Sequence, residues 1–158
     1  MNLEFAKVHE GAKAPEKAHD SDAGFDVFWC PPSPEINGLE TRHFVELDEN
    51  ASRRFETGLK FNIPEGWALV IFNRSGVASK KNVVVGACVV DEGYKGEVFI
   101  DLHNIGYEMQ LFKPGDKIAQ FLLIPVPNCS LTEVSLEDII NSERGEKCLG
   151  SSDAKESR

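Results

Sequence analysis

The sequence predicts an all-β fold, a jelly-roll-like barrel or sandwich, on the strength of three observations. Short apolar stretches rich in Val, Ile and Phe recur along the chain, and these residue types favour strands. Apolar and polar residues alternate through 98–102 and again through 117–123, which is the period of a half-buried strand. Turn-forming sequences at 64–66, 92–93 and 114–115 punctuate these stretches. Many short strands joined by tight turns are typical of a barrel or a two-sheet sandwich.

Two segments depart from the strand pattern. Residues 75–81 (SGVASKK) predict a short helix with Ser75 as its N-terminal cap. From residue 142 onward the chain is rich in Gly, Ser and charge, with Leu149 as its one large apolar residue. Such a composition alone is typical of a frayed tail. We therefore expect a β domain over 1–141 and a flexible arm over 142–158.

Composition and charge exclude several classes of protein. The chain has 158 residues, of which 41% are hydrophobic and 27% charged, as in one soluble domain. Its formal net charge of -9 argues against nucleic-acid binding, because a basic surface supplies most of that affinity. No run approaches the roughly 20 apolar residues that span a bilayer, and the N-terminus lacks the apolar core of a secretory signal. We expect a cytoplasmic protein without nucleic-acid or membrane partners.

Neither a zinc site nor a disulfide framework is expected. The cysteines show no C-x-x-C pattern, and no two histidines have ligand spacing. Disulfides are also rare in chains without an export signal. We interpret the four cysteines as ordinary thiols: Cys30, Cys88, Cys129 and Cys148. We interpret the four histidines as structural or solvated side chains: His9, His19, His43 and His103.

Three segments in the first two thirds of the chain carry residues suited to phosphate and nucleoside chemistry. SDAGFDVF (21–28) places Asp26, which can orient water or the hydration shell of a metal, after a glycine. NRSGVASK (73–80) offers a guanidinium, a hydroxyl and free backbone N–H groups to a phosphate. GACVVDEGYKGEV (86–98) places Asp91 at the end of an expected strand, where its carboxylate can accept a proton from water. Three residues on, the ring of Tyr94 could form the floor of a sugar pocket.

Two further segments complete the set. PGDKIAQFLL (114–123) holds Gln120 inside an apolar strand, where a buried amide requires hydrogen-bond partners. ERGEKCLGSS (143–152) is flexible and rich in donors, although it lacks the P-loop pattern. Taken singly, each of the five segments is also compatible with an ordinary turn, capped helix, β-hairpin, surface strand or tail.

In this order and at this spacing, the five segments resemble the five motifs of the trimeric dUTPase family, which also includes dCTP deaminases. The match runs from Ala23 to Ser152, and VVDEGYKGE (89–97) is its most specific part. The resemblance implies a jelly-roll-like (β-clip) subunit, a homotrimer with active sites at subunit interfaces, and a C-terminal arm that closes over a site as lids do. It implies hydrolysis of dUTP to dUMP and pyrophosphate.

The resemblance also implies roles by position. Asp91 would be the general base that activates water for attack on the α-phosphorus. Mg²⁺ would bind through the triphosphate and waters, without direct protein ligands. Tyr94 would pack under the deoxyribose, and Asp26 would support Asp91 or the waters of the metal. A hairpin over about 85–89 would read uracil through backbone groups of Val85, Gly86 and Val89. The remaining substrate-binding positions would be Arg74, Ser75, Gly76, Gln120, Arg144, Leu149, Gly150, Ser151 and Ser152.

The chain departs from the family pattern in two places. The arm usually carries two glycines and then an aromatic residue that stacks on uracil, but here these positions are Lys147, Cys148 and Leu149. Base stacking is worth roughly 1–3 kcal/mol per base, so weaker binding or looser closure is expected, offset in part by the positive charge of Lys147. Cys88 replaces a usual glycine just before the catalytic strand, which bears on the backbone dihedrals of the hairpin.

Two other functions stay open at this point. A dCTP deaminase, or a bifunctional deaminase and dUTPase, is suggested by Asp101, which falls where the deaminases have a catalytic Glu. Those enzymes have a further arginine near position 79, however, and this chain has Ser79. A nucleotide-sensing regulatory protein with the same fold is suggested by the altered arm, and it would bind nucleotide without releasing pyrophosphate. A purely structural jelly-roll protein would have no reason to retain the site residues together.

Overall fold

The strands that the sequence pattern predicts are present in the computed structural model, which describes residues 2–32 and 44–139. The chain divides into one unit over 1–127 and a second over 128–158. The second unit contains, among its described residues, a single 3₁₀ turn, η1 (Leu136–Asp138). None of the helices in the described ranges is both long and apolar enough to cross a bilayer.

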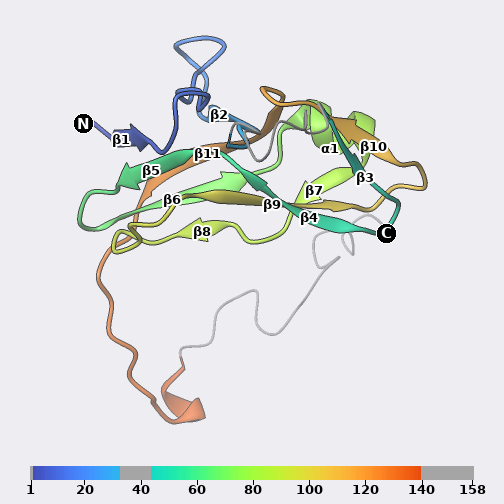
Figure 1. The fold of residues 1–158 in the computed structure, drawn as a ribbon. Helices are drawn as coiled ribbons and strands as arrows, with labels where there is room; N and C mark the ends of the chain where they lie inside the picture. Colours follow the sequence, from blue (N-terminus) through green and yellow to red (C-terminus); the bar gives the residue numbers. More distant parts are fainter. Residues whose placement is uncertain (1, 33–43, 140–158) are drawn as a thin grey trace, which may run out of the picture. The chain divides into compact units, whose positions relative to one another are not determined.

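The first unit consists of short strands and one helix (Figure 1). In chain order its elements are β1 (Glu4–Lys7), β2 (Phe25–Phe28), β3 (Val45–Leu47), β4 (Ser52–Glu56), β5 (Leu59–Asn62), β6 (Trp67–Phe72), α1 (Ser75–Lys81), β7 (Val83–Val85), β8 (Val89–Val90), β9 (Phe99–Asn104), β10 (Gln110–Phe112) and β11 (Lys117–Pro125).

The strands form antiparallel sheets whose neighbours are far apart in sequence. One sheet has the order β2-β11-β6-β8 and a second has the order β4-β9-β7, while β1 pairs with β5 and β10 with β3. Every strand pair in the described part of the chain is antiparallel. The all-β, jelly-roll-like fold class predicted from the sequence is thereby confirmed.

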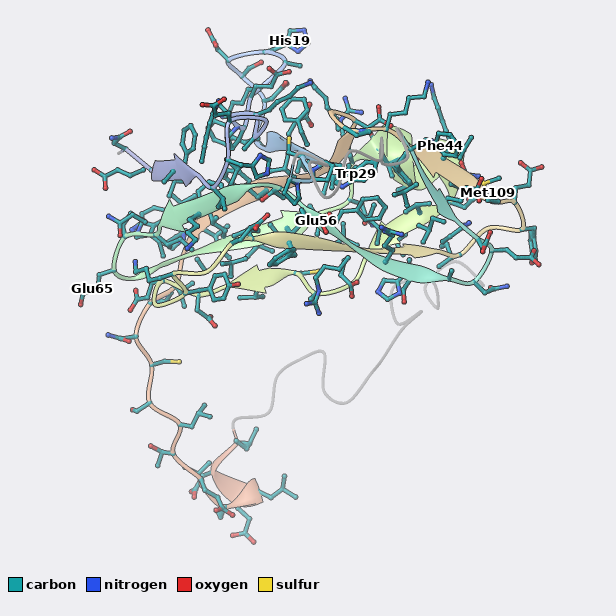
Figure 2. The ribbon with its side chains drawn as sticks, viewed as in Figure 1. His19, Trp29, Phe44, Glu56, Glu65 and Met109 are labelled. Atoms are coloured by element: carbon teal, nitrogen blue, oxygen red, sulfur yellow. The ribbon has the colours of Figure 1, made fainter. Side chains whose placement is uncertain are left out.

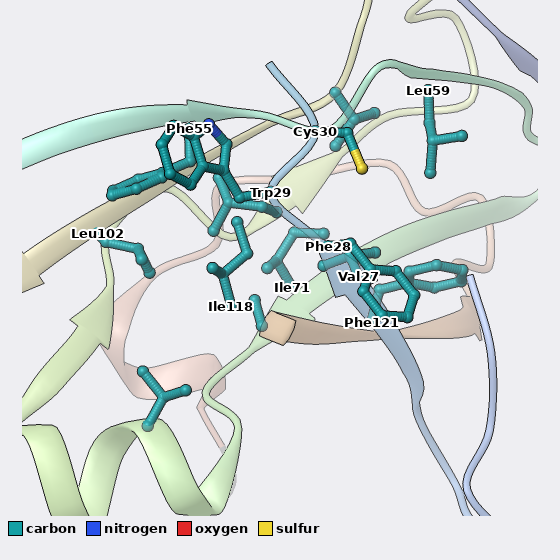
Figure 3. Packing of buried hydrophobic residues seen from close by; sticks show 14 of the residues in the cluster. Val27, Phe28, Trp29, Cys30, Phe55, Leu59, Ile71, Leu102, Ile118 and Phe121 are labelled. Atoms are coloured by element: carbon teal, nitrogen blue, oxygen red, sulfur yellow. The ribbon is translucent and has the colours of Figure 1, made fainter. Parts of the chain in front are cut away.

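The core lies between the sheets and is rich in aromatic and branched side chains (Figure 3). Phe55 is fully buried, and its ring packs edge-on against Trp29 and Phe112, with centroid separations of 5.4 and 5.1 Å. The indole N–H of Trp29 donates a hydrogen bond to Glu56 Oε2 at 3.2 Å, so the polar edge of the ring is satisfied (Figure 2). Such packing stabilises the fold by several kcal/mol per large side chain.

The predicted alternation holds in β9 and is interrupted in β11. Ile100 and Leu102 of β9 are fully buried, as the period of two requires. In β11, Ile118 and Ala119 are both buried, because the pairing with β2 shifts register between residues 117 and 119. A β-bulge of this kind inserts one residue and resets which side chains face the core. The alternation expected over 117–123 was therefore wrong at its start.

The predicted helix over 75–81 is confirmed, but its N-terminal cap is Arg74 and Ser75 is the first helical residue. Arg74 has extended dihedrals, and its carbonyl accepts hydrogen bonds from the N–H groups of Val77 and Ala78, both at 2.9 Å. The helix ends at Asn82, whose φ of 52° is left-handed, a conformation that asparagine tolerates well.

A buried amide ties the end of β9 to β3. The side chain of Asn104 is 1% exposed. It donates to the carbonyls of Leu47 at 3.0 Å and Glu108 at 2.8 Å, and it accepts from the N–H of Gly106 at 2.9 Å. Both N–H donors and the carbonyl oxygen of this amide thus hold backbone groups of the neighbouring loop and strand.

We predict that Asn104→Ala lowers the free energy of unfolding by about 3 kcal/mol, because two carbonyls and one N–H lose their partners. Urea denaturation measures the change. Asn62→Ala is the matched control: Asn62 also bonds two side chains, Glu4 and Lys95, but on the surface, so its removal should cost at most about 0.5 kcal/mol. Equal losses in the two variants would contradict the structural role given to Asn104.

Candidate functional site

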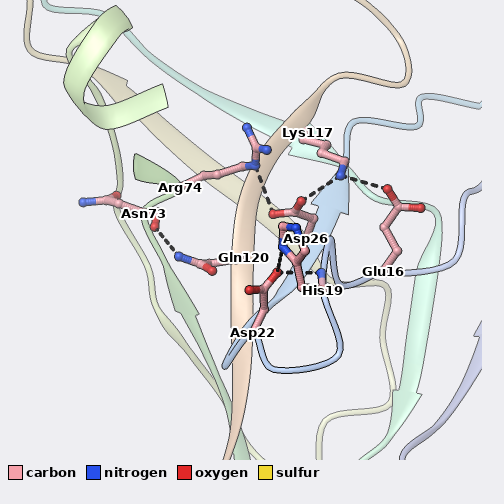
Figure 4. Close-up of polar contacts among 8 residues, drawn as sticks. All are labelled: Glu16, His19, Asp22, Asp26, Asn73, Arg74, Lys117 and Gln120. Atoms are coloured by element: carbon pink, nitrogen blue, oxygen red, sulfur yellow. Dashed lines mark hydrogen bonds and ion pairs between the residues drawn. The ribbon is translucent and has the colours of Figure 1, made fainter. Parts of the chain in front are cut away.

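Asp26 is the centre of a charged network at one edge of the four-stranded sheet (Figure 4). Its side chain is only 12% exposed. Arg74 Nε donates to its Oδ1 at 3.0 Å, and Lys117 Nζ lies 2.9 Å from its Oδ2. Lys117 also contacts Glu16 Oε1 at 2.8 Å. A carboxylate withdrawn from water is stabilised by such paired cations.

These contacts fix the charge state of Lys117. Hydrogen bonds to the carboxylate of Glu16, the larger effect, and to that of Asp26 raise the pKa of Lys117 above its ordinary value. The ammonium is therefore the form present at neutral pH. Lys117 stands in the same segment as Gln120, but nothing in the sequence indicated that Glu16 would join it, since the two are a hundred residues apart.

Gln120 lies beside this network, on the face of the sheet that it shares with Asp26 and Phe72, its partners across the neighbouring strands. Its amide nitrogen donates to the carbonyl of Asn73 at 2.9 Å. A Cβ on Gly24 would overlap Gln120 Oε1 and lie 3.1 Å from Cδ, so glycine at this position leaves room for the Gln120 amide. Gln120 is therefore half-buried, with one partner for its amide, and the fully buried amide expected from the sequence was wrong.

A cavity of about 490 Å³ opens at this position. It is lined by residues of the first, second and fourth motif segments and their neighbours, namely Ala18, Asp22, Ala23, Gly24, Asp26, Phe72, Asn73, Gln120 and Leu122. Arg74 reaches the same place through its bond to Asp26. Ser75 is exposed and Gly76 half-buried at the first turn of α1.

Asp91 and Tyr94 lie together in a second cavity of about 290 Å³. The N–H of Tyr94 donates to the carbonyl of Asp91 at 3.0 Å and closes a turn. The phenol hydroxyl donates to the carbonyl of Glu97 at 2.8 Å. A Cβ on Gly96 would come within 2.6 Å of the ring carbon Cζ, so Gly96 leaves room for the ring. Hydrogen bonds from its backbone N–H and from its hydroxyl thus fix the orientation of Tyr94.

The segment between β7 and β8 differs from the predicted hairpin. β7 pairs with β9 in one sheet, whereas β8 pairs with β6 in the other, so residues 85–89 form a crossover between sheets, here called the crossover segment. Its backbone is held by three hydrogen bonds: from Val85 N–H to Asn73 Oδ1 at 2.7 Å, from Gly86 N–H to the Asp101 carbonyl at 2.8 Å, and from Ile71 N–H to the Cys88 carbonyl at 2.7 Å.

Cys88 fits this backbone without strain. It is not among the positive-φ residues of the described chain, which apart from glycines are Asn50 and Asn82. Its thiol donates to the carbonyl of Gly86 at 3.0 Å. Cys30, Cys88 and Cys129 are free thiols. The replacement of glycine at position 88 therefore leaves the local fold intact.

The two cavities share no residue among the described ones. Ile71 lines the second and Phe72 the first, and consecutive residues of a strand point to opposite faces. Asp26, Arg74 and Gln120 are brought together by the fold, and so are Asp91, Tyr94 and Val89, but these two groups are not brought together within one chain.

Asn73 connects the two groups and was missed by the sequence reasoning. Its carbonyl accepts from Gln120 beside the first cavity, and its side chain accepts from Val85 of the crossover segment. Its position directly before Arg74 was the available signal. Arg54 also lines the second cavity and carried no comparable signal, whereas Asp101, which lines it too, was noted only for the deaminase alternative. Outside the described residues lie the remaining predicted site positions and departures, Arg144, Lys147, Cys148, Leu149, Gly150, Ser151 and Ser152.

Comparison with known proteins gives consistent results. A family model described as dUTPase matches residues 10–153. The deoxyuridine 5'-triphosphate nucleotidohydrolase of Alkaliphilus metalliredigens is 31% identical over 98% of this chain and 99% of its own. The enzyme of the same name from Clostridium novyi is 33% identical over 96% of this chain and 98% of its own.

Solved structures show the same similarity. The dUTPase of Staphylococcus bacteriophage 80alpha with dUpNHpp has a TM-score of 0.75 and 28% identity, covering 95% of this chain and 97% of that one. A mutant dUTPase from phage phi11 of S. aureus, whose structure concerns the coordination of a structural Mg(II) ion, has a TM-score of 0.71 and 25% identity, covering 87% and 99%.

We predict that Lys117→Gln lowers the free energy of unfolding by about 2 kcal/mol at neutral pH, through loss of hydrogen bonds to two carboxylates. Because the pKa of Lys117 is raised in the folded state, its stabilisation is complete at neutral pH and is lost as the pH rises through that raised pKa. Denaturation series from neutral to strongly alkaline pH measure the difference between variant and wild type.

Lys113→Gln serves as the control, since the ion pairs among the described residues do not include Lys113. That variant should match the wild type throughout. A difference between Lys117→Gln and wild type that stayed constant into the alkaline range would contradict the charge-dependent role of Lys117.

Proposed function

The chain belongs to the dUTPase family, and we propose that it hydrolyses dUTP to dUMP and pyrophosphate. The observation that carries this proposal is the second cavity, where a carboxylate, an oriented aromatic ring and the backbone of the crossover segment surround one space. The relatives named as deoxyuridine 5'-triphosphate nucleotidohydrolases match over almost the whole chain, which supports the same activity here.

In the proposed reaction Asp91 is the general base. Its carboxylate forms no hydrogen bond or ion pair within the described part of the chain, while its backbone is fixed by the turn to Tyr94. It can therefore accept a proton from a water molecule. That water attacks the α-phosphorus, the bond to the bridging oxygen breaks, and pyrophosphate leaves with the electron pair.

Tyr94 selects the sugar in this proposal. With its hydroxyl bound to the Glu97 carbonyl and its ring seated over Gly96, the side chain is held without help from substrate. A deoxyribose would lie on the ring, and a 2'-hydroxyl would meet its bulk. A rigid aromatic platform of this kind needs no reorganisation on binding.

The crossover segment would read the base. Ala87 lines the second cavity, and its backbone N–H and carbonyl form no hydrogen bond with any described residue. They are thus available to uracil, whereas Val85 N–H and Gly86 N–H are already used inside the protein. A site built from fixed donors and acceptors rejects a base with the opposite pattern, as cytosine has at its exocyclic position.

The group formed by Asp26, Arg74 and Gln120 would bind the triphosphate. The guanidinium of Arg74 gives one of its five N–H donors to Asp26, which leaves the others for phosphate oxygens. Ser75, Gly76 and Gln120 would add a hydroxyl and amide groups. From the arm, Arg144, Ser151 and Ser152 would reach the terminal phosphates. These local cations and donors would offset the repulsion from the net charge of -9.

Mg²⁺ would be bound through the triphosphate and water molecules. Asp26 retains lone pairs beyond those used by Arg74 and Lys117 and could accept hydrogen bonds from metal-bound water. The ion would supply charge neutralisation to the triphosphate.

We further propose that the protein is a homotrimer whose sites form between subunits. The two residue groups line separate cavities in one chain, so the phosphate-binding group of one subunit would meet the Asp91 group of another. A rotationally symmetric ring presents two different surfaces at each contact, as this arrangement requires.

We predict that Asp91→Asn lowers kcat for dUTP by about 10²- to 10⁴-fold with little change in KM, because the amide cannot take the proton. Glu92→Gln is the matched control: its side chain accepts a hydrogen bond from the N–H of Gly66, an interaction that glutamine preserves, and it should leave kcat unchanged.

The assay supplies Mg²⁺ with dUTP, dCTP, dTTP or UTP and measures pyrophosphate and ammonia separately. Pyrophosphate from dUTP alone is the expected outcome. Ammonia from dCTP would support the deaminase alternative, and nucleotide binding without pyrophosphate would support the regulatory one. Turnover of Asp91→Asn at the parental rate would show that another group is the base.

A further inference from the structure

Two polar side chains of β9 face away from the core next to the crossover segment. Asp101 and His103 alternate with the buried Ile100 and Leu102, so they share the outer face of the sheet. Their side chains are 38% and 42% exposed, and His103 Nε2 lies 3.5 Å from Asp101 Oδ2. From the sequence alone, His103 was interpreted as a structural or solvated side chain.

Both side chains lie directly against the backbone of Gly86. The N–H of Gly86 donates to the Asp101 carbonyl at 2.8 Å. A Cβ on Gly86 would overlap His103 Nε2, and it would lie 2.8 Å from His103 Cδ2 and 3.1 Å from Asp101 Oδ2. A side chain at position 86 would therefore displace the imidazole of His103, because real Cβ atoms do not approach other atoms so closely.

The contact is close to the proposed base-binding position. Gly86 directly precedes Ala87, which lines the second cavity together with Asp91, Tyr94 and Asp101. On the neighbouring strand β4, Arg54 pairs with Asp101 and lines the same cavity. The outer face of β9 is thus continuous with the wall of the site.

We propose that His103 and Asp101 are positioning residues that clamp Gly86 and thereby set the path of the crossover segment that distinguishes uracil from cytosine. This inference rests on the proposed function. The imidazole lies where a side chain of residue 86 would be, and the Asp101 carbonyl accepts the hydrogen bond from the N–H of Gly86. Ala87 then presents its backbone groups at a fixed position. A shift of about 1 Å in such groups is enough to impair binding and selectivity.

The direct test is a double-mutant cycle. Gly86→Ala inserts a methyl group into the space of the imidazole, and it should raise KM for dUTP at least about tenfold, with a smaller effect on kcat. His103→Ala should also raise KM and should reduce the preference for dUTP over dCTP. In the double variant the new methyl fills the vacated space, so KM should fall below that of Gly86→Ala alone.

Two further variants separate positioning from general destabilisation. Gly93→Ala adds the same methyl where no described atom lies within 4 Å, and it should behave as wild type. His103→Phe keeps a planar ring over Gly86 and should retain most of the wild-type KM. Thermal unfolding of each variant shows whether it is folded at the assay temperature.

The outcomes distinguish this inference from the proposed function. A wild-type protein that releases no pyrophosphate from dUTP would refute the proposed function. An active wild type in which the effects of Gly86→Ala and His103→Ala simply add, or in which His103→Ala keeps its KM and its base preference, would overturn the clamp. Suppression in the double variant together with rescue by His103→Phe would establish it.

Discussion

The carboxylate of Asp26 joins three parts of the chain that are distant in sequence. It belongs to β2, bonds Arg74 before α1, and pairs with Lys117 of β11. Because the group is largely withdrawn from water, removing either cation would leave a buried charge poorly compensated. The place of the Arg74 guanidinium, the cation proposed to meet the triphosphate in this part of the site, depends on this one anion.

The same sheet that gathers these residues keeps them apart from Asp91. The order β2-β11-β6 puts Asp26, Gln120 and Phe72 side by side, while Ile71 points to the opposite face and lines the cavity of Asp91 and Tyr94. Asn73, just after β6, accepts hydrogen bonds from Gln120 beside the first cavity and from Val85 beside the second. One chain therefore holds the two residue groups at separate cavities, and in the proposed trimer a second subunit would bring them together.

Local patterns were sufficient to predict the fold class and the helix over 75–81. Residue type and period decide these features within a few positions. The cap at Arg74 escaped prediction because Ser75, a usual residue type for a cap, directly follows it. The bulge before Ala119 and the crossover between β7 and β8 escaped because each is decided by pairing with a distant strand. Glu16 and His103 escaped for the same reason: their partners are defined only once the sheets are assembled.

The sharing of each site between subunits is tested most directly by mixing two inactive variants. Arg74→Gln impairs the phosphate-binding half and Asp91→Asn the catalytic half, so each alone should release little pyrophosphate from dUTP. After joint unfolding and refolding in equal amounts, about one quarter of wild-type activity should return, since about one site in four then combines two intact halves. A mixture no more active than the separate variants would show that one chain holds the whole site.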